Sequence, residues 1–229
     1  MHAMISSAET ILASFALHCR QVVHLILGIL ETHLRLPPGS LLALHKDDDA
    51  RGDFISLQHR ASEPSDERTV QKGEHTDFGS ITMLFNWLGG LQIREQSQDT
   101  VGDWLYIKPI PASCVINLAD SLVKLTAGIL KSNIHRVAPA PGHQAGLPRY
   151  SLVYFAHPND AVELKPVQGG LVDAVQLRVE EGGKPITAAE WVIRRSLGDL
   201  RGVYTYKGGI EWRDLNDAVL TSDHVQVKA

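Results

Sequence analysis

The chain has 229 residues, of which 44% are hydrophobic and 21% are charged, and its formal net charge is −4. This composition is typical of one globular domain with a sizeable core, and it excludes an intrinsically disordered chain. Lysine and arginine are scattered along the sequence, which excludes a strongly basic nucleic-acid surface. We therefore expect a small molecule, and no nucleic acid, as the partner.

Cysteine usage indicates a reducing compartment. The two cysteines, Cys19 and Cys114, stand far apart in apolar surroundings and form no CxxC pair. Neither a disulfide framework nor a cysteine metal site is indicated. We expect two core thiols and a cytoplasmic protein.

The apolar segment at residues 9–30 raises the question of a membrane span. It is interrupted by four polar residues, so no uninterrupted apolar stretch of 18 residues remains: His18, Arg20, Gln21 and His24. The ten residues at the start contain no Lys or Arg, which a secretory signal requires. We expect no membrane partner, and the segment predicts a helix of a globular protein.

The start, end and buried face of this helix can be predicted. Ser6 and Glu9 have the spacing of a capping box, and the turn formers at residues 37–39 end the segment. Apolar residues that recur at roughly helical spacing predict one buried face: Ile11, Phe15, Val22, Ile26 and Ile29.

The chain after residue 40 has the pattern of a β protein. Six β-branched or aromatic runs are separated by Gly, Pro and Asp clusters, at residues 53–59, 79–87, 91–95, 104–110, 113–120 and 149–158. This spacing predicts a mainly β sandwich or barrel. We expect a loop at 60–73, one helix at 120–132 and a last helix at 186–202, which Thr187 and Glu190 open as a capping box.

His75 and Asp77 stand two apart at the head of an apolar, β-branched run, in GEHTDFGSITML. Residues i and i+2 of a strand face the same way, so an imidazole and a carboxylate would lie side by side, as a metal site requires. The pair alone is more typical of an exposed turn.

A third candidate ligand follows in KSNIHRVAP, where His135 stands among apolar neighbours. Two histidines and one carboxylate on one face of Fe(II) leave the opposite positions open, as non-haem oxygenases require, although zinc can use the same ligands. Taken alone, such a histidine is more often a core or surface residue. Downstream of an HxD pair in a β chain, it predicts an iron oxygenase.

A carboxylate-binding pair is predicted near the end of the β region. Arg149 and Ser151 alternate onto one face of the run at 149–158, so a guanidinium and a hydroxyl can grip one carboxylate. By itself, the pair is also typical of a surface arginine beside a strand serine.

Together these motifs resemble the isopenicillin N synthase-like branch of the Fe(II)/2-oxoglutarate-dependent dioxygenases. The similar segments occur in family order across residues 36–160: LPPGSLLALH, HTDFGSITMLF, GGLQI, DWLYIKPIPASCVINLADSL, GILKSNIHRVAPAPG and RYSLVYFAHPND. The segment KPITAAEWVIRRSLGDLRGVY also resembles the C-terminal helix of fungal members.

The resemblance implies a double-stranded β-helix, or jelly roll, with a long N-terminal helix and a C-terminal helix. The implied organisation is an N-terminal helical segment at 1–40, a dioxygenase core at 41–160 and a C-terminal extension at 161–229 whose helix packs on the core. It implies that His75, Asp77 and His135 are the Fe(II) ligands, and that Arg149 and Ser151 bind the carboxylate of the cosubstrate 2-oxoglutarate. Family members consume dioxygen, release succinate, and hydroxylate, desaturate or cyclise a small molecule, here in secondary metabolism.

Three departures from the family pattern leave alternatives open. Members usually carry an N-terminal domain of about a hundred residues, whereas the sequence given starts directly at the expected long helix. Residues 58–61, Gln-His-Arg-Ala, put Arg60 where a tyrosine commonly helps to bind 2-oxoglutarate, and Ala127 replaces an asparagine, a change we expect to be structural. The alternatives are a 2-oxoglutarate-independent oxidase of the isopenicillin N synthase type and a truncated, non-catalytic relative.

The other histidines of the sequence carry no expected chemistry. We expect His157 to be structural, and His45, His59 and His143 to bind no metal. Three apolar residues either line a cavity or belong to the core, with the core favoured: Leu84, Phe85 and Phe155. The sequence indicates neither the substrate nor the oligomeric state.

Overall fold

The computed structural model describes residues 7–60, 72–96, 101–175 and 185–201. The helices are α2 (Glu9–His33), α3 (Asp120–Leu125) and α4 (Ala188–Arg201), with the 3-10 turns η1 (Leu42–Leu44) and η2 (Gly142–Gly146). The strands are β1 (Phe54–Arg60), β2 (Lys72–His75), β3 (Ile81–Asn86), β4 (Leu91–Gln96), β5 (Val101–Tyr106), β6 (Val115–Leu118), β7 (His135–Val137) and β8 (Arg149–Ala156).

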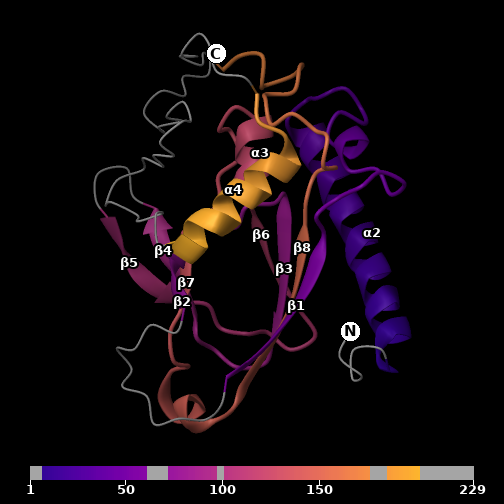
Figure 1. The fold of residues 1–229 in the computed structure, drawn as a ribbon. Helices are drawn as coiled ribbons and strands as arrows, with labels where there is room; N and C mark the ends of the chain where they lie inside the picture. Colours follow the sequence, from indigo (N-terminus) through magenta and orange to yellow (C-terminus); the bar gives the residue numbers. More distant parts are fainter. Residues whose placement is uncertain (1–6, 61–71, 97–100, 176–184, 202–229) are drawn as a thin grey trace.

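The strands form two antiparallel sheets, as the sequence predicts. One sheet has the order β1-β8-β3-β6 and the other has the order β2-β7-β4-β5. In Figure 1, α2 runs along the β1 and β8 side of the first sheet, and α4 crosses in front of both sheets. Apart from β4 and β5, neighbours in each sheet are distant in the sequence, so residues from separate segments can meet between the sheets.

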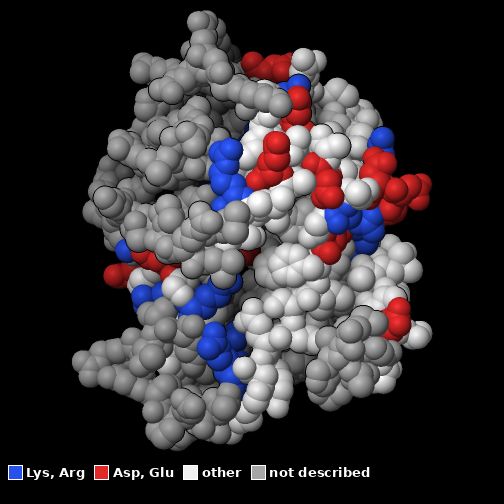
Figure 2. All heavy atoms as spheres, viewed as in Figure 1, with Lys and Arg blue, Asp and Glu red and all other residues white. Residues whose placement is uncertain are grey.

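The buried face of α2 differs from the predicted one. The buried apolar residues Cys19, Val23 and Leu27 follow an i, i+4, i+8 spacing, whereas Ile11 is 73% and Ile29 is 48% exposed. The other predicted residues, Phe15, Val22 and Ile26, are partly buried. The prediction of the face was therefore wrong at its ends, because α2 is apolar on more than one side and periodicity alone does not select the side that meets the sheet. At the lower right of Figure 2, where the first half of α2 lies in Figure 1, the described residues are mostly uncharged.

The start of α2 also differs from the prediction. The helix begins at Glu9 after the N-cap residue Ala8, and no side chain caps it. Glu9 is thus the first residue of the helix rather than the third, which a capping box would need; Ser6 lies outside the described residues. At the other end, the helix stops at His33, before Pro37, and Arg35 has a positive φ of 57°.

Buried polar groups hold α2 on the core. The Glu31 carboxylate accepts hydrogen bonds from the backbone N–H groups of Gly39, Leu41 and Leu42 at 2.8, 2.6 and 2.9 Å. Three turns earlier in the helix, Arg20 faces the sheet and binds Asp53 at 3.0 Å.

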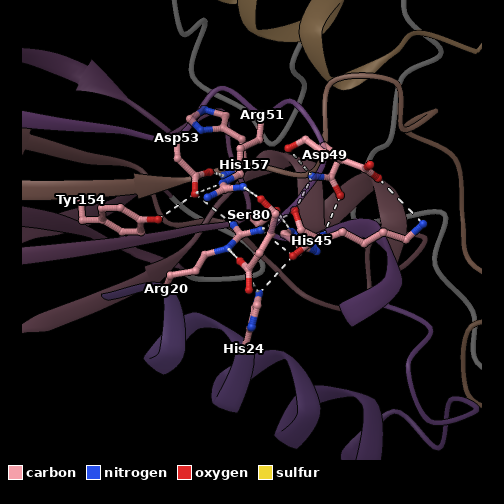
Figure 3. Close-up of polar contacts among 12 residues, drawn as sticks. Arg20, His24, His45, Asp49, Arg51, Asp53, Ser80, Tyr154 and His157 are labelled. Carbon is pink, nitrogen blue, oxygen red and sulfur yellow. Dashed lines mark hydrogen bonds and ion pairs between the residues drawn. The ribbon is translucent and has the colours of Figure 1, made fainter. Parts of the chain in front are cut away.

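Figure 3 shows the wider network around Asp53. Its carboxylate also accepts hydrogen bonds from the Tyr154 hydroxyl and from the His157 backbone N–H, each at 2.7 Å. Arg20 reaches Asp47 at 3.0 Å and donates to the carbonyl of His45. Every buried charge in this network thus has an opposite charge or a hydrogen-bond partner, which burial requires.

Two short strands and the length of α3 were not predicted. β2 and β7 have four and three residues and contain Lys, His and Arg, so they lack the apolar alternation of a strand. The helix predicted at 120–132 ends at Leu125, because Ala127 and Gly128 have positive φ angles of 53° and 76°. Asparagine and glycine adopt positive φ angles most readily. The replacement of the family's asparagine by Ala127 therefore falls at a position where the backbone conformation matters.

The predicted opening of the C-terminal helix is confirmed. The Glu190 N–H donates to Thr187 Oγ1 at 3.2 Å, and the Thr187 N–H donates to Glu190 Oε2 at 3.0 Å. These reciprocal bonds form the capping box at the start of α4. Trp191, one turn into the helix, donates from Nε1 to the Phe78 carbonyl at 3.1 Å and so fixes α4 beside the turn that follows β2.

Candidate active site

Three side chains with metal-ligand chemistry converge between the sheets. One ligand atom from each of His75, Asp77 and His135 lies within 4.8 Å of the others. His75 ends β2 and His135 begins β7, and the two residues are directly paired across these strands. Asp77 lies in the turn after β2, so the prediction that it shares a strand with His75 is wrong, although both side chains face the same point.

The turn that carries Asp77 depends on a close backbone approach. A Cβ atom added at Gly79 would lie 2.3 Å from the Ala156 carbonyl oxygen, so only glycine fits there. The neighbouring backbone is held by three hydrogen bonds: Ser80 N to Ala156 O, Ser121 N to Gly79 O and Asp120 N to Asp77 O. Asp77 is therefore supported by backbone contacts to both β8 and α3.

Hydrogen bonds orient both imidazole rings. Nδ1 of His75 lies 2.8 Å from the Gly73 carbonyl, and Nδ1 of His135 lies 3.1 Å from the Asn133 carbonyl. A carbonyl only accepts, so each Nδ1 donates to its carbonyl, which leaves each Nε2 as the nitrogen that can bind a metal. These Nε2 atoms lie 3.8 and 3.6 Å from Asp77 Oδ1.

Burial and neighbouring groups set the protonation of the cluster. Burial lowers the pKa of His75 to about 3, and the proximity of His135 adds to this effect. Burial by itself would raise the pKa of Asp77, but His135 and the hydrogen bonds from Asn117 and Thr82 outweigh it, so this pKa lies below the usual value. A neutral imidazole and an ionised carboxylate are the forms that bind a metal.

Sequence reasoning missed two residues that hold Asp77. Asn117 Nδ2 donates to Asp77 Oδ2 at 2.9 Å, and the Thr82 side chain also hydrogen-bonds this carboxylate. Thr82 and Asn117 are paired across β3 and β6. Two polar residues inside apolar strands were the available signal, but their pairing is visible only in the fold.

A second missed group supports the turn from α4. Arg195 Nη2 lies 3.4 Å from Asp120 Oδ2 and 3.3 Å from Thr76 Oγ1, and Thr76 itself donates to Asp120 at 2.8 Å. Burial raises the pKa of Asp120, and the charge of Arg195 opposes the shift. Because Thr76 stands between His75 and Asp77 in the chain, this contact fixes the backbone from which both side chains project.

The predicted pair Arg149 and Ser151 lies on one face of β8, and both residues are buried. Arg149 donates from Nε to the Gly89 carbonyl at 2.9 Å, across to the start of β4. Among the described residues, its terminal nitrogens have no hydrogen-bond partner, and the buried Ser151 hydroxyl has none either. An orphaned buried hydroxyl beside a guanidinium fits a carboxylate ligand.

This pair faces the same side of its sheet as the partners of Asp77. Thr82 pairs with Phe155, and residues at even spacing from Phe155 along β8 share its face: Val153, Ser151 and Arg149. The cluster of His75, Asp77 and His135 and the Arg149–Ser151 pair therefore lie on the same side of this sheet.

His45 and Phe85 have structural contacts. His45 lies 2.8 Å from the Leu41 carbonyl through Nδ1 and 2.7 Å from Ser80 Oγ through Nε2. Phe85 stacks edge-on with Phe15 of α2 at 5.3 Å and belongs to the core. Leu84 and Phe155 instead lie on the sheet strands that carry Thr82 and Ser151.

A separate cavity of about 750 Å³ lies between α2 and β1 and is lined by residues such as Arg20, Asp47 and Phe54.

A jelly roll with two histidines and one carboxylate in contact is characteristic of mononuclear non-haem iron oxygenases. Comparison with known proteins agrees. A family model described as the 2OG-Fe(II) oxygenase superfamily matches residues 38–158, which is more than half of the chain. The chain therefore belongs to the 2OG-Fe(II) oxygenase superfamily.

Several curated relatives are fungal. A 2-oxoglutarate-dependent dioxygenase of Aspergillus fumigatus is 29% identical over 75% of this chain and 49% of its own length. Another, from Amanita muscaria, is 36% identical over 57% of this chain and 62% of its own length. A third, from Glarea lozoyensis, is 32% identical over 70% of this chain and 47% of its own length. The chain spans about half the length of most of these relatives.

Solved structures confirm the predicted mainly β fold. A putative 2OG-Fe(II) oxygenase family protein from Caulobacter crescentus superimposes with a TM-score of 0.71 at 28% identity, covering 89% of this chain and 62% of that protein. A full-length Neurospora crassa protein, solved in complex with alpha-KG and 5-formyluracil, gives a TM-score of 0.68 at 24% identity, covering 82% of this chain and 60% of that protein.

The residues present fit both groups that the family uses. The cluster at residues 75, 77 and 135 offers two imidazole nitrogens and a carboxylate oxygen, the donor set for Fe(II). Arg149 and the orphaned hydroxyl of Ser151 offer the donors that a carboxylate of 2-oxoglutarate needs.

Proposed function

We propose that this protein is an Fe(II)- and 2-oxoglutarate-dependent oxygenase that oxidises a small molecule. The observation that carries the proposal is the orientation of the histidine rings. Both Nδ1 atoms are engaged by backbone carbonyls, and both Nε2 atoms turn toward Asp77 Oδ1, at 3.8 and 3.6 Å. Two ring nitrogens and one carboxylate oxygen that converge on one point supply the donor set of a mononuclear Fe(II) site.

The chain's residues have separate roles in this proposal. His75, Asp77 and His135 would hold the metal, and Asn117 keeps one carboxylate oxygen of Asp77 occupied so that the other faces the histidines. Arg149 and Ser151 would hold the cosubstrate by a carboxylate. When bound, Fe(II) with 2-oxoglutarate supplies the oxidation of a C–H bond by dioxygen, with succinate and carbon dioxide as coproducts. The protein's part is binding, orientation and exclusion of side reactions.

Further parts of the proposal concern the setting of the protein. The partners are a small molecule and dioxygen, without nucleic acid or membrane, and the pathway is one of secondary metabolism. Cys19 and Cys114 are free thiols, which supports a reducing compartment such as the cytoplasm.

The proposal is tested by anaerobic titration with Fe(II) and then 2-oxoglutarate. Wild type should develop the weak visible charge-transfer band only when both are present. His75→Ala should lose the band, Arg149→Ala should weaken it, and Ser151→Ala should weaken it without lowering thermal stability, because the hydroxyl has no partner to lose. His143→Ala, an exposed residue of η2, is the matched control and should behave as wild type.

Two results would contradict the proposal in different ways. Iron binding without any band in wild type would favour a 2-oxoglutarate-independent oxidase. Failure to bind iron at all would identify a relative that keeps the fold without the chemistry.

A further inference from the structure

Helix α3 begins with a buried carboxylate that accepts hydrogen bonds from two distant parts of the chain. Asp120, the first residue of α3, is 8% exposed. The Thr76 hydroxyl donates to its Oδ2 at 2.8 Å, and the Ser132 hydroxyl donates to its Oδ1 at 2.7 Å. The two oxygens of one carboxylate therefore link the segment before β3 to the segment before β7.

The Ser132 bond holds the segment that carries His135. After α3 the chain reverses at two residues with positive φ angles, so that Ser132 returns to Asp120, twelve residues away. Ser132 directly precedes Asn133, whose carbonyl accepts the hydrogen bond from His135 Nδ1 at 3.1 Å. The group that orients the His135 ring is thus next to the residue that Asp120 binds.

The Thr76 bond holds the segment that carries the other two proposed ligands. Thr76 is fully buried and stands between His75 and Asp77. The Asp120 N–H also donates to the Asp77 carbonyl at 3.0 Å. Side chain and backbone of Asp120 therefore both bind this segment.

Strand pairing alone gives these two segments little support. β2 and β7 are paired only at Lys72 with Val137 and at His75 with His135, and the register shifts between these pairs. Asp77 lies beyond the end of β2 and takes no part in the ladder. Its place relative to His135 has to be fixed by contacts outside the sheet.

We infer that Asp120 is a positioning residue that fixes the separation between the segment of His75 and Asp77 and the segment of His135, so that the three ligands are arranged before the metal binds. This inference rests on the proposed function. Groups that hold metal ligands in place typically change metal affinity by about 10- to 100-fold when they are removed.

The experiment measures Mn(II) affinity by competition against a chromophoric chelator, well below the melting temperature of each variant. Ser132→Ala should weaken Mn(II) binding about tenfold, because the segment of His135 loses its bond to Asp120. Ser132→Thr keeps a hydroxyl and should retain most of the affinity. Thr76→Val should weaken binding by roughly three- to tenfold, since the backbone bond from Asp120 to Asp77 remains.

The double variant Thr76→Val/Ser132→Ala tests whether one residue connects the two segments. The two bonds act in series through Asp120, so breaking the second bond should add little once the first is broken. The double variant should therefore lose much less affinity than the product of the two single losses. Two independent contacts would give losses that multiply.

Tyr154→Phe is the matched control for the loss of a hydrogen-bonded hydroxyl. The Tyr154 hydroxyl donates to a different carboxylate, Asp53, also at 2.7 Å. Tyr154→Phe and Ser132→Ala should both lower the melting temperature of the metal-free protein. Only Ser132→Ala should also lower Mn(II) affinity and change the visible absorption spectrum of the Co(II)-loaded protein, which reports the arrangement of the ligands.

The outcomes distinguish the inference from the proposed function. If Ser132→Ala binds Mn(II) like wild type, or if the losses in the double variant multiply, Asp120 does not position the two segments and the inference fails while the proposed function stands. If wild type binds neither Mn(II) nor Co(II), the metal site itself is refuted.

Discussion

His45 is a buried base whose protonation opposes folding. It is fully buried, and burial lowers its pKa to about 4. Leu41 and Ser80 occupy its two ring nitrogens, and Arg20 lies nearby. The folded protein therefore holds the neutral ring where the unfolded chain would already bind a proton.

This difference predicts a pH dependence of stability. The folded pKa is below the unfolded one, so the stabilisation is complete above about pH 6.5 and is lost as the pH falls toward 4. Between pH 7 and 4.5, the loss from this group should be about 2 kcal/mol. Urea unfolding of wild type and His45→Asn at several pH values measures it: the variant should lose less stability on acidification. Parallel curves for the two proteins would show that His45 does not titrate in this way.

Helix α4 contacts the turn that carries Asp77. Its capping box fixes where the helix starts, and Arg195, two turns later, reaches Asp120 and Thr76. A helix that begins one residue earlier or later would turn Arg195 away by about 100°. The capping box therefore determines whether Arg195 reaches Asp120 and Thr76.

Removing this contact should loosen the metal site. Arg195→Met leaves the buried Asp120 without its ion pair, and we expect metal affinity to fall by about tenfold because the backbone at Thr76 is less constrained. Competition for Mn(II) against a chromophoric chelator measures the change. Ile193→Ala, an exposed position on the same helix, is the control. Wild-type affinity in Arg195→Met would show that the turn holds its geometry without α4.

Helix α2 is long and apolar enough to cross a membrane when judged by length and composition alone. Its contacts indicate a different role. Arg20 and Glu31 are buried against the folded domain with their charges compensated, and Val23 and Leu27 are fully buried. The outward side still carries several exposed apolar residues: Ile11, Leu17, Leu25 and Ile29.

The cluster of His75, Asp77 and His135 joins the two sheets of the molecule. His75 and His135 belong to the sheet of β2 and β7, whereas Asp77 is hydrogen-bonded by Thr82 and Asn117 from the other sheet. An ion bound by all three residues would tie the sheets together, so metal binding and global stability are linked.

Metal should therefore raise the melting temperature of the whole domain. At a free concentration about a hundred times the dissociation constant, linkage gives roughly 2.7 kcal/mol, or about 5–10 °C for a domain of this size. Differential scanning fluorimetry with Mn(II) measures the shift. His75→Ala should lose it, while Arg149→Ala should retain it. A shift of equal size in His75→Ala would place the binding elsewhere.

Much of the architecture could be predicted from local patterns. The longer strands alternate clearly, so β1, β3, β6 and β8 were located within a few residues, and the common face of Arg149 and Ser151 followed from the alternation. The spacing of His75, Asp77 and His135 indicated one cluster, and the fold brings these residues together.

The remaining features depend on contacts that no local pattern encodes. The face of α2 that meets the sheet is decided by the sheet, since the helix is apolar on several sides. β2 and β7 exist because they pair with each other and, for β7, with β4. Arg195 and Asn117 reach the site from 119 and 40 residues away in the sequence, a distance over which spacing carries no signal.

Both faces of strand β8 carry residues with a role. One face carries Arg149 and Ser151, and the other carries Tyr154 and Ala156, which pack in the core with α2. Inserting or deleting one residue inside this strand would exchange the two faces beyond that point. The change would turn Arg149 and Ser151 outward, or it would move Tyr154 away from Asp53. Changes in chain length are therefore tolerable in the loops that flank β8, and the eight residues of the strand have to be inherited or engineered as a unit of fixed length.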